Sequence, residues 1–241
     1  INVAQPASLR QQILTKQMLL CVYTGFMSGF PYYLLYQLVQ LWLSKRGVDV
    51  ANIGLFALVG LPYSWKFLWA PMLDRYFYEK VGRRRSWLLP TQFFMVLGFS
   101  SLGFIAPEQH LWPTFVLLFI LAWLSATQDV ALDAYRREIL ADNELGLGNS
   151  IHVQMWRIAG FIPGSLSFIL AAHFNWPWVF IITAGFFLVG FCISFRLPEA
   201  KLGPIEHLSL EQAFIAPFKE FLQRNGVKMT CAILTFMVLY K

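Results

Sequence analysis

The chain has 241 residues, of which 57% are hydrophobic and only 13% are charged. Soluble domains carry about a quarter charged residues, so this composition and a mean hydropathy of +0.55 exclude an ordinary soluble domain and predict an all-α polytopic membrane protein. The net charge of +6 comes from short basic loops between apolar runs, and it therefore gives no reason to expect a nucleic-acid partner.

Six apolar runs are long enough to cross a bilayer, whose core of about 30 Å needs about 20 helical residues. A cytoplasmic N-terminal segment, residues 1–17, precedes them. Because the connections are short, we expect sequential helices to be antiparallel neighbours in one bundle, residues 18–197. In chain order the predicted spans cover residues 18–43, 50–72, 87–106, 112–134, 148–173 and 176–197.

Basic residues are distributed unevenly between the two ends of these spans. Of 19 Lys and Arg, 14 fall on one side and only Lys45 and Arg46 on the other. Positive charge favours the cytoplasmic side. The asymmetry therefore predicts a multi-pass protein of a bacterial cytoplasmic (inner) membrane with its N-terminus in the cytoplasm.

The character of the chain changes after the sixth run. Residues 198–226 are predicted to form a cytoplasmic linker with an amphipathic helix, capped by Ser209 and Gln212 in a capping box and ended by Gly226. Residues 227–241 are apolar but too short to cross. We interpret them as the start of a seventh span, so that the chain resembles half of a larger bundle.

Four ionisable residues lie inside the predicted spans: Lys66, Asp129, Asp133 and Arg157. All fall in the cytoplasmic half, within roughly 8–14 Å of that boundary at 1.5 Å per residue. Each charge would cost about 2.5–3.5 kcal/mol at the bilayer centre, so partners are required. We therefore expect spans two, four and five to face one another or a shared aqueous cavity, with the acids balanced by Lys66 and Arg157.

Two interpretations of this cluster remain open. It can be a structural ion cluster that holds helices together. Alternatively, Asp129 or Asp133 is a proton-coupling site, and Lys66 and Arg157 bind an anionic group. Asp129 is the deeper acid, while Asp133 lies beside Arg136 and also suits a latch.

Polar side chains also follow helical spacing in two other places. Tyr33, Gln37 and Gln40 recur along span one, and Gln154 shares a face with Arg157. Such a stripe suits a ligand rich in hydroxyl and amide groups, such as a sugar or a peptide. Interhelical hydrogen bonding explains each residue equally well.

The loop "APMLDRYFYEKVGRRRSW" resembles the signature between spans two and three of the major facilitator superfamily. Ala70 replaces the usual Gly, and six residues separate the Asp-Arg pair from the next Gly. The resemblance implies the N-terminal six-helix half of such a transporter plus the start of a seventh helix. It also implies a latch whose ion pairs break and reform between conformations. The predicted latch residues are Asp74, Arg75, Arg83, Arg84, Arg85 and Arg136.

The stretches "LVGLPYSWKFLWAPMLDRY", "GRRRSWLL", "SATQDVALDAY" and "WRIAG" together resemble the AmpG family of muropeptide permeases. The resemblance implies proton-driven import of N-acetylglucosamine–anhydro-N-acetylmuramyl peptides across the inner membrane, for peptidoglycan recycling and β-lactamase induction. By matching positions it implies functional roles for Lys66, Gln128, Asp129, Asp133 and Arg157. The related acetyl-CoA transporter family shares parts of the pattern, so another organic anion is an alternative substrate.

Two other classes of membrane protein predict features that the sequence lacks. An enzyme acting on lipid-linked sugars predicts acids, His or metal ligands clustered in an interfacial loop, and a channel predicts repeated charge rings. We therefore expect no catalytic residues, no metal and no cofactor, with the proton gradient as energy source. The expected partners are a small glycopeptide substrate, the lipid bilayer and a C-terminal six-helix half of the same protein.

Overall fold

The computed structural model describes residues 13–199 and 210–240, so the predicted cap Ser209 lies outside the described residues. All regular structure in these residues is helical. The chain divides into two compact units, residues 1–201 and 202–241.

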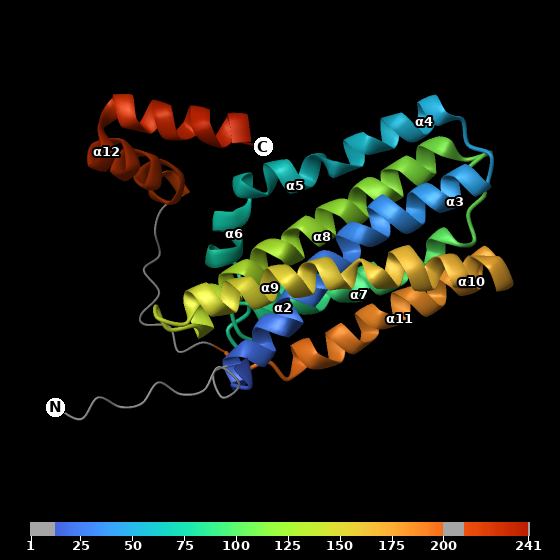
Figure 1. The fold of residues 1–241 in the computed structure, drawn as a ribbon, viewed down its shortest axis with the longest axis horizontal. Coiled ribbons are helices and arrows are strands. Elements are labelled where there is room, and N and C mark those ends of the chain that lie inside the picture. Colours follow the sequence, from blue (N-terminus) through green and yellow to red (C-terminus); the bar gives the residue numbers. More distant parts are fainter. Residues whose placement is uncertain (1–12, 200–209, 241) are drawn as a thin grey trace. The chain divides into compact units, whose positions relative to one another are not determined.

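The first unit is a bundle whose long helices run lengthwise beside one another (Figure 1). Helix α2 packs against α8 and α9, and α7 packs against α8 and α11. The elements in chain order are α2 (Lys16–Tyr33), the π-helical turn η1 (Leu34–Leu38), α3 (Val39–Lys45), α4 (Val50–Leu55), η2 (Phe56–Gly60), α5 (Leu61–Trp65), η3 (Lys66–Leu68), α6 (Ala70–Arg75), α7 (Arg85–Leu102), α8 (Leu111–Ile139), α9 (Leu145–Ala159), the π-helical turn η4 (Ile162–Leu166), α10 (Ser167–His173) and α11 (Trp176–Phe195).

Four helices in the described part of the chain are long and apolar enough to cross a membrane. They contain the first, fourth, fifth and sixth predicted spans. The third span is the 18-residue helix α7, about 27 Å long at 1.5 Å per residue, and it is not among the four. The four helices are Lys16–Lys45, Leu111–Ile139, Leu145–His173 and Trp176–Phe195.

The second predicted span is not one continuous helix. It consists of α4, η2, α5, η3 and α6, with short 3₁₀ turns between α-helical pieces. Pro62 and Pro71 lie in the first turns of α5 and α6, where proline is tolerated because its missing N–H has no helical partner. Gly60 ends η2, and a Cβ there would lie 1.9 Å from the Tyr36 hydroxyl. These residues divide the predicted rod into segments.

Small residues allow α2 and α9 to approach each other closely. A Cβ on Gly25 would lie 2.2 Å from the carbonyl oxygen of His152. Gly29 follows one turn later on the same face, so the pair forms the spacing of small residues that brings membrane helices together. The α-helical ladder of this span changes to the π-helical turn η1 at Leu34, shortly after Pro31.

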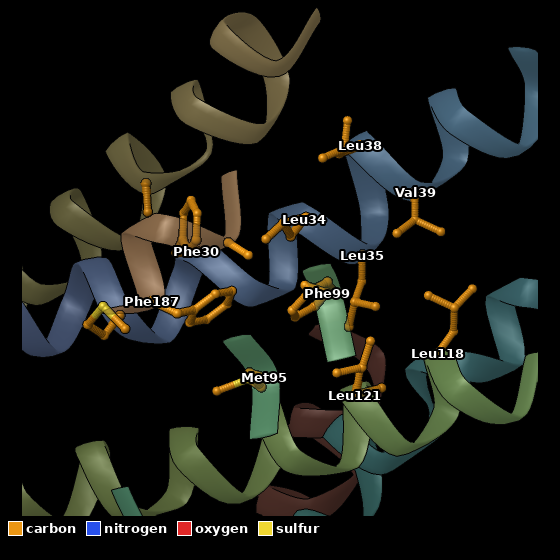
Figure 2. Packing of buried hydrophobic residues seen from close by; sticks show 14 of the residues in the cluster. Phe30, Leu34, Leu35, Leu38, Val39, Met95, Phe99, Leu118, Leu121 and Phe187 are labelled. Carbon is orange, nitrogen blue, oxygen red and sulfur yellow. The ribbon is translucent and has the colours of Figure 1, made fainter. Parts of the chain in front are cut away.

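The apolar core lies where α2, η1, α7, α8 and α11 meet (Figure 2). Phe30 of α2 packs edge-on against Phe187 of α11, with ring centroids 4.9 Å apart. Phe187 in turn stacks on Phe99 of α7. These buried rings fix the lateral positions of the helices, and therefore the position of α8, which carries the acidic residues.

The second unit contains α12 (Leu210–Tyr240), which is interrupted at Gly226. Gly226 has a φ of 71°, a left-handed conformation that glycine adopts without steric cost. The prediction that a helix ends at this glycine is confirmed. Residues 227–240 continue as helix beyond the break.

Candidate functional site

Lys66 of η3 and Asp129 of α8 form an ion pair through Nζ and Oδ2. The Lys66 side chain is 33% exposed and that of Asp129 is 14% exposed, so the pair is shielded but still reached by solvent. Ser28 of α2 donates a hydrogen bond to the other carboxylate oxygen of Asp129. The predicted meeting of spans two and four is therefore confirmed, and span one contributes a third partner.

Asp133 lies one turn further along α8 and contacts three basic side chains. Its Oδ2 lies 3.6 Å from Lys66 Nζ, and its Oδ1 lies 3.1 Å from Arg136 Nη2. The Nε2 atom of His152 on α9 is 3.8 Å from the same Oδ1. Asp129 and Asp133 thus share Lys66, as the i, i+4 spacing on one helix face allows.

Gln128 faces away from the acids and toward α2. Its side chain is fully buried and donates a hydrogen bond of 2.6 Å to the Met27 carbonyl oxygen. A side-chain bond to the backbone of α2 ties α8 to this helix next to the acidic pair. In this structure Gln128 therefore positions the site rather than lining it.

Arg157 does not join the acidic cluster. It is exposed on α9, and within residues 13–199 and 210–240 no ion pair involves it. The expectation that Arg157 balances an acid of the cluster is thus not met, because Arg136 and His152 occupy the places around Asp133. Gln154 is also exposed on α9, and both side chains are available to groups outside this part of the chain.

The predicted polar stripe of span one separates into three environments. Tyr33 packs against Trp156 of α9 with ring centroids 4.8 Å apart. Gln37 lies in the π-helical turn η1 against Gly164 of η4. Gln40 is exposed and lies at the edge of a small cavity that it helps to line.

Tyr33 is part of a group of aromatic rings between α2, α5 and α9. Tyr32 contacts Tyr36, Tyr63 and Trp156 with ring centroids 4.5–5.3 Å apart. The rings are half-buried, and Trp156 immediately precedes Arg157. An exposed cation is therefore adjacent to a partly exposed aromatic surface.

Three of the predicted latch residues, Asp74, Arg83 and Arg84, form a second charged network, whereas Arg136 pairs with Asp133 of the first. Asp74 at the end of α6 contacts Arg83 Nη2 at 2.8 Å and Arg84 Nη1 at 2.7 Å. Arg84 is only 3% exposed, and its Nε donates to both carboxylate oxygens of Glu138, at 3.0 and 3.2 Å. Burial lowers the pKa of Arg84, but the hydrogen bond that Arg84 donates to Glu138 and the charge of Asp74 outweigh burial and raise this pKa above its ordinary value.

The third arginine of the loop reaches a different element. Arg85 Nε contacts Glu199 Oε1 at 3.2 Å, just beyond α11. Gly82 has a φ of 107°, and a Cβ there would lie 2.1 Å from this same Glu199 oxygen. Arg75 instead lies over the ring of Tyr76. The loop between α6 and α7 thus holds the ends of α8 and α11 together.

A pocket of about 370 Å³ joins the two networks. Lys66 and Asp133 line it from the acidic cluster, and Asp74 and Arg84 line it from the latch. Phe67, Ala70, Val130 and Ala134 complete the lining. Charged residues of both networks therefore line one pocket.

Sequence reasoning missed four residues of these networks. In the sequence, Ser28 is one small residue of an apolar run and His152 is one of four scattered histidines. Glu138 and Glu199 look like ordinary charges at the ends of spans. Their partners are distant in sequence, so only the packing of α2, α9 and α11 reveals them. In the described residues, no group of three His, Cys, Asp or Glu is arranged to hold a metal.

Comparison with protein families then assigns the chain. The family model described as acetyl-coenzyme A transporter 1 matches residues 17–174, which include Lys66, Asp74, Arg84, Asp129, Asp133 and Glu138 of the two charged networks but not Glu199. The chain belongs to this transporter family.

Individual relatives confirm the likeness to the AmpG family. The anhydromuropeptide permease of Escherichia coli K12 is 34% identical over 218 residues, which cover 90% of this chain and 44% of the permease. An uncharacterized protein of Haemophilus influenzae is 45% identical over 236 residues, which cover 97% of this chain and 56% of that protein. The chain thus spans about half the length of these relatives.

Proposed function

We propose that the full-length protein is a proton-coupled importer of anhydromuropeptides that works by alternating access in the inner membrane. The observation that carries the proposal is that Lys66 of η3 is shared by Asp129 and Asp133, which both lie on α8, a helix long and apolar enough to cross a membrane. Ionisable groups are costly there and are typical of proton and substrate pathways. The permease name of a relative at 34% identity supports the choice of substrate.

In this proposal the charged groups have separate tasks. Arg157, which has no ion pair in the described residues, binds a carboxylate of the peptide. Tyr32, Tyr33 and Trp156 offer aromatic surface to the sugar rings. Protonation of Asp129 breaks its pair with Lys66 and changes the charge of the cluster, which favours one of the two conformations. A C-terminal half would cover this face.

Uptake by the purified full-length protein tests the proposal. Proteoliposomes with an acidic exterior are expected to accumulate labelled anhydromuropeptide, and those without a pH gradient are expected only to equilibrate. Asp129→Asn is expected to abolish gradient-driven accumulation. If this variant accumulates substrate as the unchanged protein does, Asp129 does not couple proton movement to transport.

Acetyl-CoA is a second candidate substrate because of the description of the matching family. Because of its phosphates, acetyl-CoA carries more negative charge than a muropeptide. A site for acetyl-CoA therefore requires more cations than the exposed Arg157 and the half-exposed Lys66. Competition separates the two: excess acetyl-CoA is expected to leave muropeptide uptake unchanged, whereas strong inhibition would favour the acyl-CoA substrate.

A further inference from the structure

His152 is a buried histidine that the proposed mechanism does not yet use. It is 6% exposed and lies on α9, where Gly25 brings the backbone of α2 into contact with its carbonyl oxygen. The backbone beneath the ring is therefore fixed by close helix packing, and the ring has little room to change its orientation.

Hydrogen bonding determines which ring nitrogen carries the hydrogen. Thr24 donates its only hydroxyl hydrogen to the Cys21 carbonyl oxygen at 3.1 Å. While Thr24 donates to Cys21, its oxygen can only accept from His152 Nδ1, which lies 3.1 Å away, and this favours the tautomer with hydrogen on Nδ1. A neutral imidazole has one N–H, so Nε2 is left with a bare lone pair.

That lone pair faces a carboxylate. His152 Nε2 is 3.8 Å from Asp133 Oδ1, and two acceptors in this position repel each other unless a proton lies between them. Asp133 is already held by Arg136 at 3.1 Å and by Lys66 at 3.6 Å. Lys66 is closer to Asp129 than to Asp133. If Lys66 moves away from Asp133, the His152–Asp133 pair loses a neighbouring positive charge and can accept a proton.

The charges around the pair are balanced without this extra proton. Lys66 and Arg136 contribute two positive charges, and the two carboxylates contribute two negative ones. One added proton leaves the cluster with a net charge of plus one. The titratable and charged groups near His152 are Cys21 of α2, Lys66 of η3, and Asp129, Asp133 and Arg136 of α8.

The pair also has a route to solvent. Asp133 lines the pocket of about 370 Å³ that reaches Asp74 and Arg84, and its side chain is 40% exposed. His152 approaches the carboxylate from α9, while the pocket is lined from η3, α6, α8 and the loop before α7. Water in the pocket can thus deliver or remove a proton beside a shielded histidine.

We propose that His152 and Asp133 form a pair that holds one proton for transport, in addition to the protonation proposed for Asp129. The proton is bound as O–H on Asp133 with Nε2 as acceptor, or as N–H on His152 with the carboxylate as acceptor. Transfer within the pair breaks one O–H bond and forms one N–H bond, and the total charge is unchanged. His152 is a positioning and proton-sharing residue, and this role rests on the proposed proton coupling.

Infrared difference spectroscopy of the full-length protein during a pH titration tests the pair without substrate. Asp133→Asn identifies the C=O stretching band of protonated Asp133 by its disappearance. His152→Asn retains an amide N–H where Nδ1 donates to Thr24 but has no group at Nε2. We expect this variant to move the Asp133 band to higher frequency, because the acid loses its acceptor.

Two further variants keep the test decisive. His152→Gln places an amide near Nε2 and is expected to restore a hydrogen-bonded band. Thr24→Val preserves the side-chain shape, frees the tautomer and is expected to alter the band as well. An Asp133 band that is identical in the unchanged protein and in a folded His152→Asn variant would overturn the pair and leave His152 a packing residue.

Uptake measurements separate this inference from the proposed function. If the pair holds the transported proton, His152→Asn changes the dependence of anhydromuropeptide uptake on pH while folding and thermal stability are kept. If the unchanged protein does not transport anhydromuropeptide at all, the substrate assignment fails, but the infrared result still decides whether the pair exists.

Discussion

Gly29 of α2 and Trp156 of α9 are in backbone contact: a Cβ on Gly29 would lie 2.3 Å from the Trp156 carbonyl oxygen. The contact lies one turn from the Gly25–His152 contact and continues the same seam. Ser28 and His152 lie on the two helices of this seam, and they contact Asp129 and Asp133 of α8.

Gly29→Ala is therefore expected to destabilise the protein by about 1–3 kcal/mol, the usual cost of overpacking. The measurement is thermal unfolding in detergent. Gly185→Ala on α11 is the matched control, because no atom lies within 4 Å of a Cβ there. The control is expected to be neutral or to gain up to about 1 kcal/mol from better helix propensity. Equal effects of both variants would contradict a close seam.

Lys66 and Asp129 are expected to be energetically coupled. Lys66→Met leaves Asp129 without its nearest cation, so the single variant should be less stable than the double variant Lys66→Met with Asp129→Asn. A double-mutant cycle on unfolding free energies is expected to give a coupling of about 1–3 kcal/mol, within the range for contacting residues. Additive effects would mean that the pair contributes nothing to folding.

Arg157 is expected to behave in the opposite way. Since no ion pair holds it in the described residues, Arg157→Met should change stability by no more than about 0.5 kcal/mol. Under the proposed function the same variant loses muropeptide uptake. Measuring both quantities on one preparation checks the prediction, and a large loss of stability would show that Arg157 has a structural partner.

Glu138 is expected to stabilise the latch through the buried Arg84. Glu138→Gln removes one of the two carboxylates that compensate this guanidinium, and it should cost about 3 kcal/mol, at the lower end for breaking a buried pair. Asp74 remains and limits the loss. Glu79→Gln is the control. Glu79 lies in the loop that carries Arg84 and is exposed, so no change in stability is expected. Equal unfolding temperatures for the two variants would argue against the network.

The sequence allowed the charge cluster to be predicted because buried charges require partners. The depths of Lys66, Asp129 and Asp133 along their helices placed them at one level, and the structure joins them. Depth says nothing about the direction in which a helix turns its faces, so Arg157 was assigned to the cluster although its side chain is exposed. Arg136 pairs with Asp133, beside which the sequence placed it.

The helix contacts were harder to predict than the helices. Apolar length predicted six spans, of which four are found as helices long and apolar enough to cross a membrane, but it also suggested a continuous second span. Pro62 and Pro71 were visible in the sequence, yet proline in the first turn of a helix is compatible with either a break or a continuous helix. Glu199 could not be assigned, because its partner Arg85 is 114 residues away and only the packing of α7 on α11 brings them together.

The division of the second span into short pieces affects how movement passes along it. In a helix with an uninterrupted ladder of hydrogen bonds, a rotation at one end carries every side chain with it. Between α4 and α6 the ladder changes type at η2 and again at η3, so α4 and Lys66 do not belong to one continuous α-helical ladder. The position of Lys66 between its two acids is therefore not rigidly tied to that of α4.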